Sequence, residues 1–536
     1  MITKIIKNVK LINWSYLIQL ILFGLIVTGI LPREISLYLA TGLVIYTLFS
    51  SLEDGVIFFV MSIPLFLALP ITKDFDNFNT WRILAILIFL KWIISQIPNY
   101  KSQITNKIQI RNFKLQNHTK LLMLLLLFAI LSVISAEDKM VAIKRIIYFT
   151  NLSLVGIVIY DLAGKNSEFT KRLIKSIAVP TIIVTVVGFA QVISTYFIDV
   201  YQFMALWGEG IQCRQFGNEW CYIAVHVGNT WLAYYGAQLS LRVFSLFPDS
   251  HSFPQFVLLG LPSIFAISLF PLWKLEIGNW KLMRMARTRM AMSILWVPAM
   301  FLIAILSGTR GIWAASAGVL IIIGGVIYWT KRTGVSSHYK NVFKYISLYM
   351  LGFFMLFSAA YPVFVSPQFL LSKGDWGLLG NRIKSIVDFG ETSNAQRILI
   401  WKESVKSIAQ HPLLGVGIGN FPVVLSQDIQ LSKAGSSAHN IYLHIAAEMG
   451  ILSLVIAVWF LWLLFNKSYY NFISEKDPFL VTYFGATLIF VPWVLIYCLT
   501  DVALFDERAF LLFVTTTSLI LSNKKLPGRE QLHGRE

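Results

Sequence analysis

The chain alternates between long apolar runs and short polar segments, and this pattern predicts membrane-spanning helices. A helix needs about 20 apolar residues to cross the hydrocarbon core of a bilayer. We identify candidate spans near residues 11–31, 36–52, 55–71, 81–97, 120–136, 141–161, 176–198, 255–273, 290–308, 311–330, 342–364, 440–465, 478–499 and 508–522. Several are short or closely spaced, and the second and third could form a tight hairpin or a re-entrant element. We therefore expect an all-α, polytopic integral membrane bundle of about 12 to 14 transmembrane helices with a long outer loop.

Basic residues between the runs predict which helix ends face the cytoplasm. If the N-terminus is cytoplasmic, the inner segments contain 26 Lys and Arg, whereas the five short outer connections contain one each. Cytoplasmic loops of membrane proteins carry this kind of excess, so we predict that both termini are cytoplasmic. Lys4, Lys7 and Lys10 precede a run of full spanning length, which predicts a retained first span rather than a cleaved signal.

Composition agrees with a membrane protein and accounts for the net charge. Hydrophobic residues make up 56% of the 536 positions and charged residues only 13%, whereas soluble proteins carry about 25% charged residues. This balance excludes a secreted, fibrous or nucleic-acid-binding protein. The formal net charge of +18 is explained by basic cytoplasmic loops and requires no polyanionic partner.

The spans divide the chain into four regions, and two predicted outer segments are unusually long. The regions are 1–198 (N-terminal helices), 199–254 (an aromatic-rich outer loop), 255–522 (further helices with the outer loop 365–439) and 523–536 (a cytoplasmic tail). The two long outer segments could be structural caps in the membrane interface, where aromatic residues are common. They could instead roof a site on the outer face. The first contains Cys213 and Cys221, which an oxidising environment would allow to pair, although their spacing leaves this open.

Three basic residues lie at predicted outer ends of spans, where charged groups are costly and therefore informative. Arg242 lies in LSLRVFSLFPDSHSF, Arg310 in the turn SGTRG, and His439 in SSAHNIYLHIAAEMG. Each alone has a structural explanation. Arg242 could anchor to lipid phosphates, Arg310 could cap the preceding helix, and His439 could be an interfacial polar residue.

Together the three residues suit group transfer from a lipid diphosphate to an acceptor hydroxyl. A guanidinium offers paired donors to phosphate oxygens, so two of them could hold a diphosphate and stabilise the charge that builds as it leaves. A histidine can take the proton of an attacking hydroxyl. Gly308 and Gly311 beside Arg310 allow a tight backbone turn.

The remaining titratable residues suggest neither a metal site nor a cofactor. His251 and His411 are outer, second-rank candidates, and no paired-carboxylate metal signature appears on the outer side. Asp501 and Asp506 are better explained as supporting residues than as metal ligands. We therefore expect a reaction that needs no metal and no cofactor.

Four segments resemble the O-antigen ligase and polymerase superfamily of bacterial envelope glycan enzymes. HPLLGVGIGNF (411–421) resembles the family element PLLGxGxGNF, and HNIYLHIAAEMGILSLV (439–455) is similar to HNxYLxxxxExGxxG, with Leu replacing the last Gly. SGTRG (307–311) resembles the SxSRG turn, with Thr for the second Ser. RVFSLFPDSHSF (242–253) is a looser match to an Arg-Val-x-Gly-x-Phe element ending in Pro-Asn. The resemblance covers about residues 240–515 in order.

This resemblance implies a metal-independent, inverting glycosyltransferase that moves a glycan from undecaprenyl diphosphate to an acceptor. It implies Arg242 and Arg310 on the diphosphate and His439 as the base. We expect substrate contacts from Arg397, Asn440 and His251. The expected partners are the lipid-linked glycan donor, a glycan, lipid or protein acceptor, and membrane lipids, but no nucleic acid. The active site would lie on the outer face of the bacterial plasma (inner) membrane.

Several alternatives remain open at the level of sequence. A ligase, a polysaccharide polymerase and a protein O-oligosaccharyltransferase differ in their acceptor, which neither composition nor motifs identify. A lipid-linked sugar transporter would belong to a different class. It predicts polar groups near the middle of the membrane and often repeat symmetry, whereas the distinctive residues here gather at outer span ends and no repeat is visible.

Overall fold

The apolar runs form helices because a helix satisfies every backbone polar group inside a bilayer. The computed structural model describes residues 2–72, 76, 78–104, 116–218, 220–221, 231–235, 238–269, 295–332, 337–371, 392–427 and 436–523. In this part of the chain, nine helices are long and apolar enough to cross a membrane. The predicted all-α, polytopic membrane bundle is thereby confirmed. The predicted tail lies outside the described residues except for Asn523.

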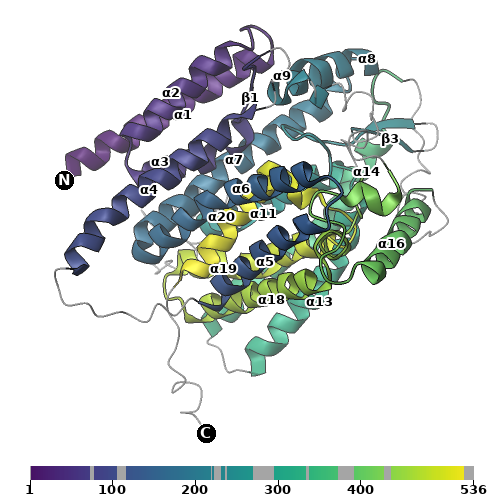
Figure 1. Ribbon diagram of the computed structural model, residues 1–536. Helices are drawn as coiled ribbons and strands as arrows, with labels where there is room; N and C mark the ends of the chain where they lie inside the picture. Colours follow the sequence, from purple (N-terminus) through teal and green to yellow (C-terminus); the bar gives the residue numbers. More distant parts are fainter. Residues whose placement is uncertain are drawn as a thin grey trace.

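The long helices lie side by side along one common direction (Figure 1). In the first half they are α1 (Ile2–Val27), α2 (Ile35–Phe49), α3 (Leu52–Ser62), α4 (Thr80–Ile104), α5 (Asn117–Leu131), α6 (Lys139–Lys165) and α7 (Ser167–Ser194). In the second half they are α11 (Ser252–Leu269), an unlabelled helix Leu295–Leu306, α13 (Arg310–Arg332), α14 (Ser337–Val365), α18 (Ile451–Ser474), α19 (Pro478–Tyr497) and α20 (Glu507–Ser522). The amphipathic α16 (Thr392–Gln410) and the short α17 (Ile441–Met449) are additional helices of this half.

Short elements connect the long helices. The 3-10 turns of the described residues are η1 (Ile63–Leu65), η2 (Ser132–Ile134), η5 (Phe421–Leu425) and η6 (Ala503–Phe505). The aromatic-rich segment after α7 forms α8 (Val200–Phe203), the π-helix η3 (Met204–Gln212) and α9 (Cys213–Phe216). In the part of the chain that the structure describes, the strands form antiparallel pairs: β1 (Ala68–Leu69) with β2 (Phe78–Asn79), and β3 (Leu232–Tyr235) with β4 (Gln238–Leu241).

The third predicted span, 55–71, is helical over only part of its length. Helix α3 ends at Ser62, and η1 and then β1 follow it. Pro64 explains the ending, because it has no backbone N–H to donate the hydrogen bond that would continue the α-helix.

The predicted span 440–465 is two helices that separate at Gly450. This residue has φ +84°, and a Cβ there would lie 2.1 Å from the Leu413 carbonyl oxygen. The Gly-rich loop after α16 approaches closely at this point. Its Val416 and Gly417 N–H groups donate to the carbonyls of Ala447 and Glu448 at the end of α17. The loop thus satisfies carbonyls that a continuous helix would have bonded internally.

The centre of the bundle is formed by α11 and α19, which are almost entirely buried and pack against each other. Around them lie α7, α13, α18 and α20. The start of α11 and the end of α19 both contribute to the cavity described below. The most buried part of the fold therefore supports the candidate site.

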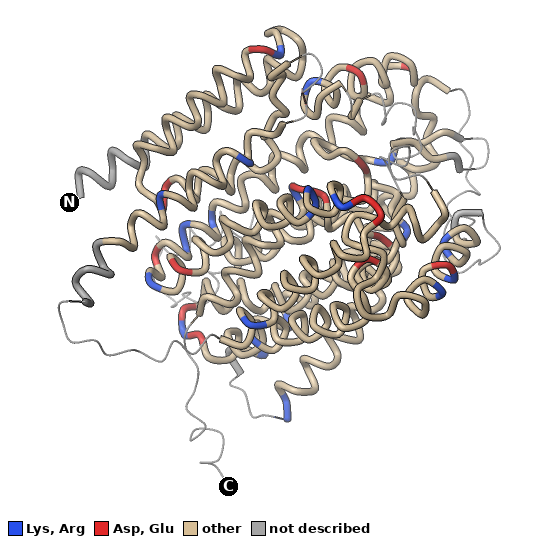
Figure 2. Tube along the Cα trace, viewed as in Figure 1, with Lys and Arg blue, Asp and Glu red and all other residues tan. Residues whose placement is uncertain are grey.

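Charged residues gather near helix ends, with long uncharged stretches between them (Figure 2). At one end, Arg172 forms ion pairs with Glu53 and Asp54, and Lys171 lies 2.6 Å from Asp477. All of these residues lie in or beside predicted inner segments. At the other end lie α8, α9, β3 and α16 (Figure 1). The predicted inner connections and the predicted outer connections thus lie at opposite ends of the bundle. Which of the two ends faces the cytoplasm stays a prediction.

A disulfide closes the short helical segment at the predicted outer end. Cys213 and Cys221, whose pairing the sequence left open, are bonded to each other with their Cα atoms 4.8 Å apart. Gly217 lies inside this loop, and its N–H donates to the Cys213 carbonyl. The bond therefore fixes the turn that follows α9.

Substituting Gly417 by Ala is expected to destabilise the protein by about 2–4 kcal/mol, because φ is +94° and the new Cβ would lie 2.5 Å from that of Ala136. Thermal unfolding of the purified protein in detergent measures the effect. Gly324→Ala is the matched control, since nothing lies within 4 Å of its added Cβ. Inside helix α13 it should stabilise by about 0.5–1 kcal/mol. Equal effects of the two substitutions would contradict the packing described for the loop.

Candidate active site

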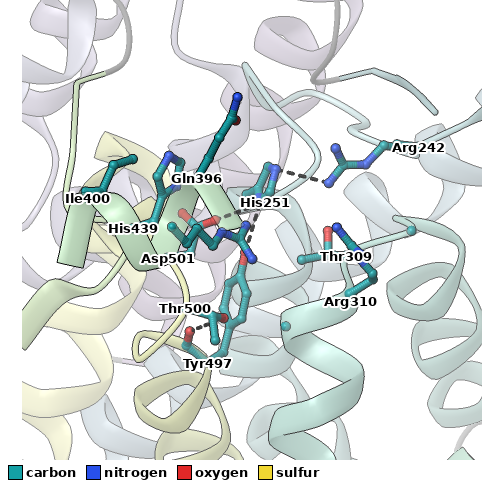
Figure 3. A pocket seen from close by; sticks show the side chains of 13 residues that line it. Arg242, His251, Thr309, Arg310, Gln396, Ile400, His439, Tyr497, Thr500 and Asp501 are labelled. Atoms are coloured by element: carbon teal, nitrogen blue, oxygen red, sulfur yellow. Dashed lines mark hydrogen bonds and ion pairs between the residues drawn. The ribbon is translucent and has the colours of Figure 1, made fainter. Parts of the chain in front are cut away.

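A cavity of ≈ 250 Å³ opens at the predicted outer end of the bundle (Figure 3). Segments far apart in the sequence line it. Its lining residues are Arg242, His251, Gly308, Thr309, Arg310, Gly311, Gln396, Arg397, Ile400, His439, Tyr497, Thr500 and Asp501.

Arg310 enters the cavity from the first turn of α13. Gly308 ends the preceding helix with φ +64°, and its N–H donates to the Ile305 carbonyl. Glycine takes this left-handed conformation at little steric cost. The buried Thr309 hydroxyl then donates to the Ser250 carbonyl at 2.8 Å and ties the turn to the start of α11.

The two glycines of this turn have different roles. Only Gly308 has a positive φ. Gly311 lies in α13, where an added Cβ would be 2.3 Å from the Thr500 hydroxyl oxygen and would also meet the Tyr497 ring. Gly311 therefore allows α13 to approach the end of α19, which brings Arg310 close to that end.

His439 lies in a left-handed backbone conformation just before α17. Its φ is +44°, which is unusual for a residue with a Cβ and costs of order 1–3 kcal/mol. Contacts on both sides hold it there. Trp401 Nε1 donates to the Ala438 carbonyl at 2.9 Å, and the Ile441 N–H donates to the Cys498 carbonyl at 2.8 Å.

Asn440 caps the helix that follows His439. Its Oδ1 accepts hydrogen bonds from the N–H groups of Tyr442 and Leu443 at 2.9 and 3.1 Å. This is the usual role of Asn at a helix N-terminus. Asn440, for which the sequence predicted a substrate contact, does not line the cavity.

Three side chains form a hydrogen-bonded chain across the cavity wall (Figure 3). His251 Nδ1 lies 2.8 Å from Asp501 Oδ2, and His251 Nε2 lies 3.0 Å from Arg242 Nη2. The hydroxyl of the buried Tyr497 also lies 3.1 Å from Nδ1. The wall of the cavity is thus connected by polar contacts from Asp501 to Arg242.

The cavity is electropositive. Three of its lining residues are arginines and one, Asp501, is a carboxylate. Helices α11, α13 and α17 also begin at or beside lining residues, and helix N-termini favour negative charge. Such surroundings favour a phosphate-bearing ligand.

The pKa values of the two central titratable groups are shifted. Burial lowers the pKa of His439 below its usual value; Asp501 opposes this shift, while Arg397 and His251 add to it. Burial alone would raise the pKa of Asp501, but its interactions with His251, then with His439 and Arg397, hold that pKa well below its usual range. At neutral pH, Asp501 is therefore ionised and His439 is neutral.

The cavity brings together most of the residues that the sequence singled out. Arg242, Arg310, His439, Arg397 and His251 all line it. His411 is exposed and lies outside the lining. His444, five residues after His439, is buried elsewhere, where its ring stacks on Phe421 with centroids 4.8 Å apart.

Sequence reasoning overlooked four polar lining residues: Thr309, Gln396, Tyr497 and Thr500. Tyr497 and Thr500 end the apolar run of α19 at the same predicted outer side as Arg310, and that shared side was an available signal. Gln396 precedes Arg397 on the amphipathic α16 and gave no comparable signal. Among the described residues, no three His, Cys, Asp or Glu side chains are grouped as metal ligands.

Asp506, predicted to be a supporting residue, caps α20 rather than lining the cavity. Its Oδ1 accepts from the N–H groups of Arg508 and Ala509. Burial raises the pKa of this carboxyl to about 7, with Arg508 opposing the shift and Asp249 and Glu507 adding to it. The folded state therefore retains a proton that the unfolded chain releases near pH 4. The contribution of Asp506 to the free energy of unfolding consequently falls as pH rises from about 4 to 7 and then stays level.

Asp506→Asn is expected to stabilise the protein by about 1–3 kcal/mol at pH 8, because Asn caps the helix without burying a charge. Near pH 5, where the carboxyl is protonated, the gain should almost vanish. Thermal unfolding at the two pH values measures this difference. Asp477→Asn is the control. Asp477 caps α19 while paired with Lys171 at 2.6 Å, so its substitution should destabilise at both pH values. A gain from Asp506→Asn of the same size at pH 5 and pH 8 would contradict the raised pKa.

Comparison of the chain with known protein families gives a match. Residues 295–458 match the family model described as O-antigen ligase. The matched part contains Arg310, Arg397, the Gly-rich loop and His439, whereas Arg242, His251 and Asp501 lie outside it. No curated protein matches the chain.

Proposed function

We propose that this membrane protein transfers a glycan from undecaprenyl diphosphate to an acceptor hydroxyl. The match of residues 295–458 to the O-antigen ligase family model supports this proposal. The observation that best supports this activity is the cavity itself. Three guanidiniums and one imidazole share a space of ≈ 250 Å³. This is the set of groups needed to hold a diphosphate and to remove one proton beside it.

Arg242 and Arg310 bind the diphosphate of the donor. Both guanidiniums stay charged at any relevant pH and offer paired N–H donors to phosphate oxygens. They also stabilise the negative charge that the diphosphate acquires as its bond to the sugar breaks. Arg397, on α16, is positioned to contact the diphosphate or the first sugar.

His439 is the general base. The acceptor oxygen forms a bond to the anomeric carbon of the sugar while His439 takes the hydroxyl proton. The bond from that carbon to the diphosphate oxygen breaks, and its electron pair leaves with the lipid diphosphate. Attack on the face opposite the leaving group inverts the anomeric centre. The lowered pKa of His439 keeps the imidazole neutral and ready to accept the proton.

The reaction takes place at the outer face of the plasma membrane, with both termini in the cytoplasm. The distribution of Lys and Arg supports this orientation. The disulfide between Cys213 and Cys221 also fits an oxidising compartment at the cavity end of the bundle. The acceptor is a lipid core, another lipid-linked glycan or a protein hydroxyl, corresponding to a ligase, a polymerase or an oligosaccharyltransferase.

The activity can be tested with purified protein in liposomes that contain undecaprenyl-diphosphate-linked oligosaccharide and a mixed acceptor pool. Release of the lipid diphosphate is followed in the presence of a metal chelator. We expect turnover to persist in chelator, and the glycosylated product to identify the acceptor and the inverted configuration. Turnover that requires a metal ion would contradict the mechanism. Movement of the lipid-linked sugar across the bilayer without transfer would replace it with transport.

A further inference from the structure

We propose that His251 is a positioning residue. Through the hydrogen-bonded chain Asp501–His251–Arg242 it orients the Arg242 guanidinium toward the diphosphate, and it transfers no proton to or from the substrate. This inference rests on the proposed function. It assigns His251 a different role from the substrate contact that the sequence suggested, because both ring nitrogens are already occupied by protein groups.

The chemistry of the two neighbours determines where the His251 proton lies. The ionised Asp501 can only accept a hydrogen bond, so the nitrogen 2.8 Å from it, Nδ1, carries the proton. A guanidinium can only donate, so the nitrogen 3.0 Å from Arg242 Nη2, Nε2, offers its lone pair. The ring arrangement that satisfies both neighbours therefore places the His251 proton on Nδ1. A carboxylate on one side of an imidazole fixes its orientation in this way at many sites.

His251 is itself held firmly by its surroundings. Asp249 Oδ1 accepts from the backbone N–H groups of His251 and Ser252 at 2.8 and 2.7 Å, at the start of α11. The adjacent Ser250 carbonyl accepts from Thr309, the residue before Arg310. One turn thus sets the position of His251 and, through Thr309, of the Arg310 turn. The separation of the two diphosphate-binding guanidiniums depends on this turn.

This arrangement also separates the roles of the two histidines in the cavity. Nε2 of His251 faces a guanidinium that does not give up its proton, so His251 has no lone pair available for an acceptor hydroxyl while Arg242 is in place. His439 Nδ1, by contrast, is buried without a hydrogen-bond partner among the described residues. His439 is thus not bound by a carboxylate or a guanidinium in the way that His251 is.

His251→Gln and His251→Leu distinguish positioning from proton transfer. Gln can accept from Arg242 through Oε1 and donate to Asp501 through Nε2, but it cannot act as a base. We expect kcat/KM for the lipid-linked donor within about threefold of wild type for Gln, and a loss of about 30-fold for Leu, about the value of one charge-assisted hydrogen bond. Equal, large losses for both would assign proton chemistry to His251. Wild-type activity for Leu would eliminate the positioning role.

A double-mutant cycle tests whether His251 acts through Arg242. In an Arg242→Ala background, His251→Leu should change kcat/KM by less than about twofold, because the Arg242 guanidinium that His251 orients is already absent. An undiminished 30-fold loss in that background would overturn the inference. Thermal unfolding of each variant checks for a general loss of structure, and His251→Ala replaces the Leu variant if the latter does not fold.

Binding of farnesyl diphosphate, a soluble isoprenoid diphosphate, separates failure of this inference from failure of the proposed function. If wild-type protein neither binds it nor turns over the lipid-linked donor, the proposed function fails and the positioning role fails with it. If wild type does both and the cycle is additive, only the positioning role of His251 fails. Weaker binding by His251→Leu but not by His251→Gln would support the inference directly.

Discussion

His439→Ala should lower kcat for glycan transfer about 1,000-fold while leaving binding of the lipid-linked donor within about threefold of wild type. The substitution removes the group that we propose takes the acceptor proton, whereas the arginines that we propose bind the diphosphate stay in the cavity lining. Single-turnover assays in liposomes measure the chemical step, and farnesyl diphosphate binding measures the donor site. Retention of more than a tenth of wild-type kcat would exclude His439 as the base.

The pH profile gives a second measure of the same residue. A base must be unprotonated to act, and burial lowers the pKa of His439. The acidic limb of kcat/KM should therefore lie below the usual histidine value of about 6.5, and activity should rise as pH increases through it. His411→Ala, at an exposed histidine outside the cavity, is the matched control and should change neither kcat nor the limb. An acidic limb above pH 7 would contradict a neutral, buried His439.

Arg310→Ala should lower kcat/KM about 100- to 1,000-fold if, as we propose, its guanidinium stabilises the charge on the departing diphosphate. Arg310→Lys keeps the charge but loses the paired donors, so we expect an intermediate loss of about tenfold. Donor binding should also weaken in the Ala variant, in contrast to His439→Ala. The two substitutions therefore differ in which kinetic constant they affect most.

Arg332→Ala provides the control for Arg310. Arg332 is exposed at the opposite end of the same helix, α13, so its loss should leave transfer unchanged. If Arg310→Ala and Arg332→Ala had equal effects, the role of Arg310 would be a general electrostatic one. If Arg310→Ala retained donor binding and kcat, the diphosphate would have to be placed elsewhere in the cavity.

Much of the fold follows from the hydropathy pattern, because apolar runs inside a bilayer have few alternatives to a helix. The pattern was less informative where tertiary contacts overrule it. The break at Gly450 depends on a loop from residues 415–417 that bonds the end of α17. Within the run 440–465 only the glycine itself hints at the break, and nothing there indicates the loop. The early end of α3 is different, since Pro64 was a visible local signal.

The candidate site was predictable in its charged residues but not in their connections. Arg242, Arg310 and His439 stood out because charged groups near membrane helices are rare. The link between His251 and Asp501 joins residues 250 positions apart in the sequence, and sequence spacing carries no information on such a contact. Asn440 was expected to contact the substrate, whereas its side chain caps α17. Capping was the ordinary expectation for Asn before a helical run.

The central position of α19 has a consequence for how the protein assembles in the membrane. This helix follows Arg242, Arg310 and His439 in the chain, yet it packs against α11, α13 and α18 and ends beside Asp501. A nascent chain that has inserted only as far as α18 therefore has Arg242, Arg310 and His439 without the wall that brings them together. The cavity therefore becomes complete only after α19 has been made and has inserted between its neighbours. Chains interrupted before α19 would carry these three residues without a formed site.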